Sequence, residues 1–64
     1  MTLKLDPNLS DADGFYEALI EAHDGLNTEQ STALNARLIF VLANQIGDKH
    51  TLQAAIDTAR KAGG

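Results

Sequence analysis

The sequence has 64 residues with no cysteine, no tryptophan and a single proline. Without cysteine it can form no disulfide, and its two histidines, His23 and His50, are too few for a closed structural zinc site. A chain this short buries a smaller share of its surface than a larger domain does. We therefore expect one domain at most, without a metal or a cofactor, and association with another chain as the remaining common source of stability.

Positive charge is also scarce. The net charge is −4, and the sequence contains only five basic residues. They are scattered along the chain: Lys4, Arg37, Lys49, Arg60 and Lys61. Binding to nucleic acid or to an anionic membrane surface requires a basic patch, so we expect neither as a partner.

Long apolar runs are missing as well. The first nine residues include no apolar segment and no small-residue cleavage pattern of a secretory signal. The longest apolar run, Leu38 to Ala43, has six residues, far short of the roughly 20 that span a bilayer. The sequence favours a cytoplasmic protein, and the absence of cysteine is compatible with that compartment.

The most apolar helical segment is Ala33 to Ile46, which has no glycine or proline. On a helical wheel its apolar residues cover an arc of about 200°, whereas a surface helix needs a stripe of roughly 100°. We expect one sector of this helix to face two neighbouring helices and the remainder to face another chain. The predicted interface residues are Leu34, Leu38, Phe40, Val41 and Leu42.

Helix start and stop signals divide the rest of the chain. Ser10 is the expected N-cap of a first helix, Asn27 with Gln30 forms the pattern of a capping box, and Asp48 is the expected cap of a third helix. The fold predicted is all-α: a three-helix domain over residues 10–64, preceded by an extended arm over residues 1–9. The predicted helices are Ser10–Asp24, Thr28–Ile46 and Asp48–Ala62.

Three polar residues of the central helix are candidate site residues. Asn35 lies among leucines, where an amide can fix the register of an assembly or cap a neighbouring backbone group. Arg37 can pair with a carboxylate, either on a partner or within the chain on Glu17, Glu21 or Asp48. Asn44 follows Arg37 by seven residues and shares its polar strip.

Other chemistry is poorly supported. Residues 6–17 imitate a calcium-binding loop, but Asp11 stands where that loop requires glycine. The spacing of His23 and His50 matches no metal-ligand motif, although the two could join carboxylates in a metal site. A chain of three helices can scarcely enclose a cavity that excludes water, so we expect no catalytic residues and no enzyme activity.

Four short runs resemble those of DUF2783, a family of short bacterial proteins of unknown function. They are DGFYEAL (13–19), LNARLI (34–39), LAN (42–44) and IGD (46–48). The resemblance implies a bacterial cytoplasmic protein. It offers no catalytic residues to transfer and suggests, at most, an accessory role beside metabolic enzymes.

The sequence does not by itself reveal the biological role. The hypothesis that we prefer is a non-catalytic interaction module that forms a homodimer through the central helix. The alternative is a small accessory subunit of a multi-subunit metabolic enzyme, such as an oxidoreductase, whose larger chain would cover the same apolar residues.

Overall fold

A computed structural model describes residues 3–63, which contain three helices and no strand. Helix α1 spans Ala12–His23, α2 spans Thr28–Ile46 and α3 spans Lys49–Ala62. The all-α, three-helix prediction is confirmed, and the bounds of α2 are those expected. The arm is described from Leu3 onward, and residues 3–9 are neither helix nor strand. Met1 and Thr2, expected to belong to it, lie outside the described residues.

Helix α1 begins later than expected. Its N-cap is Asp11, not Ser10, and the Asp11 carboxylate accepts a hydrogen bond from the Gly14 backbone N–H at 3.1 Å. Asp11 adopts the left-handed conformation, with φ of 50°, which aspartate tolerates better than most residues. A Cβ on Gly14 would lie 2.2 Å from an Asp11 carboxylate oxygen, so the glycine makes room for the capping side chain.

The other helix ends follow the local signals. Asn27 accepts from the Gln30 N–H at 2.9 Å, and the Gln30 side chain accepts from the Asn27 N–H at 3.0 Å, which completes the predicted capping box. Gly47, with φ of 78°, ends α2 in the left-handed conformation. Asp48 caps α3 by accepting from the Thr51 N–H at 3.0 Å, as predicted.

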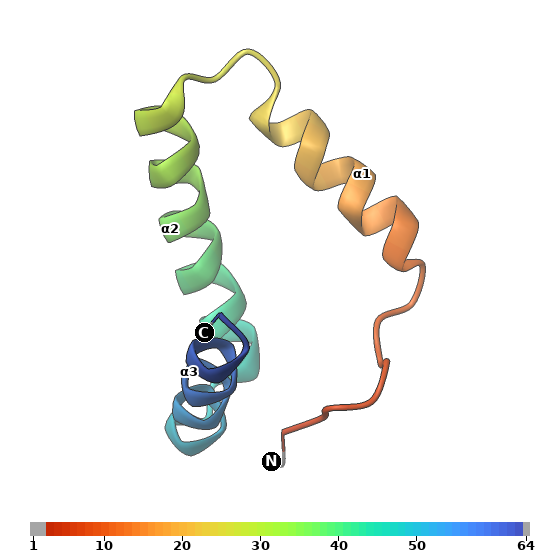
Figure 1. Cartoon of the computed structure of the whole chain (residues 1–64), viewed down its shortest axis with the longest axis vertical. Coiled ribbons are helices and arrows are strands. Elements are labelled where there is room, and N and C mark those ends of the chain that lie inside the picture. Colours follow the sequence, from red (N-terminus) through yellow and green to blue (C-terminus); the bar gives the residue numbers. More distant parts are fainter. Residues whose placement is uncertain (1–2, 64) are drawn as a thin grey trace.

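The helices are arranged in an open way (Figure 1). Helices α1 and α2 diverge from the connection that joins them, and α3 crosses the far end of α2, while the arm runs from α1 back toward α3. The Cα radius of gyration is 13.3 Å. A compact domain of this length has a radius of gyration of about 10.7 Å, so the chain is extended for its size.

No apolar side chain among residues 3–63 is buried. The one buried residue there is Thr51, at the start of α3. We expected part of α2 to be covered by its two neighbours. Ala33, Leu34, Leu38 and Ala43 are indeed half-covered, but none of its apolar residues is fully buried. The reason is the divergence of α1 from α2, together with the small side chains that α3 presents, Ala55 and Ala59 among them. The large apolar residues of α2 remain accessible.

Candidate interaction surface

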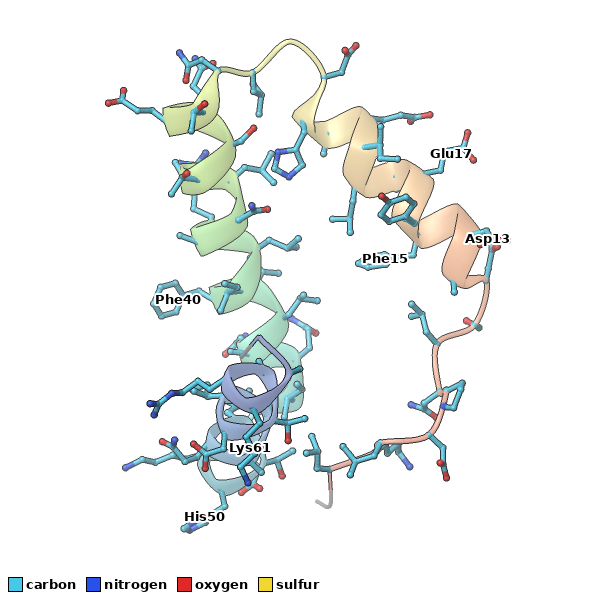
Figure 2. The ribbon with its side chains drawn as sticks, viewed as in Figure 1. Asp13, Phe15, Glu17, Phe40, His50 and Lys61 are labelled. Atoms are coloured by element: carbon cyan, nitrogen blue, oxygen red, sulfur yellow. The ribbon has the colours of Figure 1, made fainter. Side chains whose placement is uncertain are left out.

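Two apolar grooves border α2, and the first lies between α1 and α2. Its volume is about 400 Å³. Figure 2 shows Phe15 on the side of α1 that faces α2. The residues lining this α1/α2 groove are Phe15, Ala18, Leu19, Ala22, Leu34, Arg37, Leu38 and Val41.

The second groove lies between α2 and α3, on another side of α2. Its volume is about 550 Å³, and every residue that lines it is apolar. Phe40 projects from α2 away from α1 (Figure 2), and its side chain is 76% exposed. The α2/α3 groove is lined by Ile39, Phe40, Leu42, Ala43, Ile46, Leu52, Ala55, Ile56 and Ala59.

The structure divides the five predicted interface residues between the two grooves. Leu34, Leu38 and Val41 line the α1/α2 groove, and Leu34 and Leu38 are half-buried there. Phe40 and Leu42 line the α2/α3 groove and are exposed. Sequence reasoning missed the contributions of α1 and α3, although their apolar periodicity identifies the same residues. A helical wheel shows which residues share a face of one helix, but it does not show the angles between helices.

Arg37 lies at the rim of the α1/α2 groove and is exposed. Within residues 3–63 the structure records no ion pair for it, so the predicted intrachain pair is not formed. Asp48, one of the partners considered for Arg37, instead accepts a hydrogen bond from the Thr51 backbone N–H. Asn44 is exposed and lines neither groove. A cation is thus available beside an apolar groove.

Asn35 joins α2 to the end of α1. Its Oδ1 accepts a hydrogen bond from His23 Nε2 at 3.0 Å, and His23 Nδ1 lies 2.9 Å from the Ser31 hydroxyl. A neutral imidazole with its proton on Nε2 satisfies both bonds, because Nδ1 then accepts from Ser31. His23 therefore bridges the two helices at one edge of the hairpin.

This arrangement places a hydroxyl, an imidazole and an amide in series, as some hydrolases do. The groove beside His23, however, is lined by residues of α1 and the following turn, and Ser31 is not among them. All three side chains find their partners within the hairpin. The arrangement fits a structural link between α1 and α2.

Comparison with known families decides the affiliation. The profile of a family described as a protein of unknown function, DUF2783, matches residues 3–61. The chain belongs to the DUF2783 family. A comparison with curated proteins finds no match, and neither does a comparison with solved structures.

The runs that first suggested DUF2783 occupy structurally important places in the chain. DGFYEAL supplies Phe15 and Leu19 to the α1/α2 groove, and LNARLI supplies Leu34 and Leu38 from the other side. IGD contains the glycine that ends α2 and the aspartate that caps α3. In this DUF2783 protein, these three short runs therefore contribute helix boundaries and apolar faces.

Across residues 3–63, no three histidine, aspartate or glutamate side chains come together in a group able to hold a metal ion. In the same part of the chain, no helix is both long enough and apolar enough to cross a membrane.

Proposed function

We propose that this DUF2783 protein is a non-catalytic interaction module that forms a homodimer through α2. The observation that carries the proposal is the exposure of four consecutive large apolar residues, which together make up about one turn of α2. Ile39, Phe40, Val41 and Leu42 are each 45% or more exposed. Contiguous apolar surface of this kind marks interaction sites on soluble proteins.

The total surface area supports the same proposal. The chain exposes 5673 Å². A compact monomer of 6.8 kDa is expected to expose about 4,000 Å², so the excess is roughly 1,700 Å². Stable interfaces bury about 800 Å² on each partner, and obligate dimers bury more. The excess, part of which lies on the arm, is therefore large enough for a stable dimer.

A second copy is the occupant that we favour, because α2 carries apolar residues on two sides and its own neighbours leave both accessible. The proposal includes the bacterial cytoplasm as the compartment, on the family resemblance. In the alternative, an accessory subunit, a larger enzyme chain would cover these residues, and the isolated protein would stay monomeric.

Val41→Asp tests the proposal. Val41 is 57% exposed in the single chain and becomes buried in the proposed dimer. An unpaired carboxylate in an apolar interface is strongly unfavourable, so we expect the dimer dissociation constant to rise about a hundredfold. Light scattering on a size-exclusion column, over a range of loading concentrations, measures the mass.

Thr32→Asp is the matched control, since Thr32 is exposed on α2 and lines neither groove. We expect the wild type and this control to run at twice 6.8 kDa and Val41→Asp to run as a monomer. A wild-type protein that remains at 6.8 kDa throughout the concentration range contradicts self-association.

A further inference from the structure

We infer that the homodimer is a four-helix bundle made of two α1–α2 hairpins, in which each α2 lies beside the α1 of the other copy. This inference rests on the proposed self-association and specifies its geometry. Three features of the hairpin carry it: matched apolar stripes, a polar link on one edge only, and complementary charge on the opposite edge.

The apolar stripes of α1 and α2 have the same spacing. Phe15, Leu19 and Ala22 are separated by four and three residues, and so are Leu34, Leu38 and Val41. All six residues line the α1/α2 groove. The alternation of four and three is the core pattern of helices packed in bundles and coiled coils. Two stripes in each chain match the four stripes that a four-helix core requires.

The hairpin leaves its groove open for such a partner. Helices α1 and α2 diverge, and the six stripe residues are exposed or half-buried. A two-helix hairpin has no second layer to cover its apolar stripes. A second hairpin placed stripe to stripe supplies that layer, since two helices then pack over the groove formed by the first two.

The two edges of the hairpin differ. On one edge, His23 of α1 bonds to Ser31 and Asn35 of α2, so that edge is closed by the chain itself. The opposite edge carries Ala18 on α1 and Arg37 on α2, which both line the groove. At about 100° per residue, Glu21 lies next to Ala18 on that same edge of α1. This edge is the one that meets a neighbouring copy.

Charge selects the order of the helices around the bundle. If α2 lies beside the α1 of the other copy, Arg37 comes next to the partner's Glu21, and the pair occurs twice by symmetry. If α2 lies beside the other α2, two arginines face each other, and two Glu21 side chains face each other across the α1 pair. Opposite charges favour the first order.

The first experiment asks which groove forms the interface. We expect Leu38→Glu, in the α1/α2 groove, to convert the dimer to monomer, and Ile56→Glu, in the α2/α3 groove, to leave it dimeric. Light scattering gives the mass, and circular dichroism verifies that each variant retains its helices. A dimer that survives Leu38→Glu but dissociates with Ile56→Glu overturns the four-helix bundle and leaves self-association standing.

The second experiment uses charge, which spares the apolar core. We expect Arg37→Glu and Glu21→Arg each to raise the dissociation constant about tenfold at low salt, and the double variant to return it close to the wild-type value. Arg60→Glu on α3 makes the same change in net charge as Arg37→Glu and controls for that change. Sedimentation equilibrium measures the constants.

The outcomes separate the two proposals. Two results contradict the helix order alone. In the first, Arg37→Glu and Arg60→Glu raise the dissociation constant of the dimer equally. In the second, the double variant dimerises no more tightly than the single variants. A monomeric wild type contradicts the proposed function itself.

Discussion

At the scale of single residues, Asp48 has the clearest electrostatic role. The hydroxyl and the backbone N–H of Thr51 both donate to its carboxylate, and the His50 backbone also contributes. These bonds favour the ionised form and hold the pKa of Asp48 below its ordinary value of 3.8. Because the folded pKa is the lower one, the contribution to stability is fully present above pH 3.8 and is lost as the pH falls through the folded pKa.

Asp48→Asn isolates this effect, because asparagine still caps the helix but does not titrate. We expect the wild type to be the more stable of the two at about pH 7 and the difference to shrink toward about pH 3. Urea unfolding followed by circular dichroism gives the difference at each pH, and the other carboxylates cancel in it. A stability difference that does not change with pH would show that the charge of Asp48 does not stabilise the fold.

Residue roles were only partly predictable. Asn35 is conspicuous in the sequence as an amide among leucines, but its partner lies twelve residues away on another helix. The link that His23 makes to Ser31 and Asn35 could not be predicted, because sequence spacing does not show how a turn brings two helices together. Local roles within three or four residues, such as those of Asn27 and Asp48, were predicted correctly.

At the scale of helices, the chain depends on its glycine stops. Gly47 has φ of 78°, and a Cβ there would meet only the Asn44 carbonyl oxygen, at 4.0 Å. The position therefore has room for a side chain, and the cost of substitution is the left-handed backbone itself. Gly63 ends α3 with an ordinary φ of −80° and carries no such cost.

We expect Gly47→Ala to lower the free energy of unfolding by about 1 kcal/mol. Gly63→Ala, the matched control, should change it by less than about 0.5 kcal/mol. Urea unfolding measures both. Equal effects of the two substitutions would show that the backbone conformation at Gly47 does not matter to the fold.

Helix boundaries were more predictable than helix packing. The bounds of α2 were read correctly because its capping box and terminal glycine are local signals. The start of α1 was placed too early because Ser10 and Asp11 are both good caps, and the choice of Asp11 depends on its unusual φ. The angle between α1 and α2 depends on the turn between them. Gly25, with φ of 78°, indicates a helix stop there but not the direction in which the next helix leaves.

At the scale of the whole molecule, the described part of the chain leaves its large apolar residues accessible. The helical wheel of α2 predicts more apolar residues than its two neighbouring helices can cover. Within residues 3–63, no apolar side chain is fully buried. A fold without a buried core gains little from the hydrophobic effect while it still loses chain entropy. Folding and association should therefore be coupled.

Thermal unfolding of the wild type across about a hundredfold range of protein concentration tests this coupling most directly, with circular dichroism as the signal. If the second copy supplies the missing core, the midpoint temperature rises by several degrees as the concentration increases, because association stabilises only the folded state. A cooperative transition with the same midpoint at every concentration would contradict the account, since the single chain would then be stable with its central helix exposed.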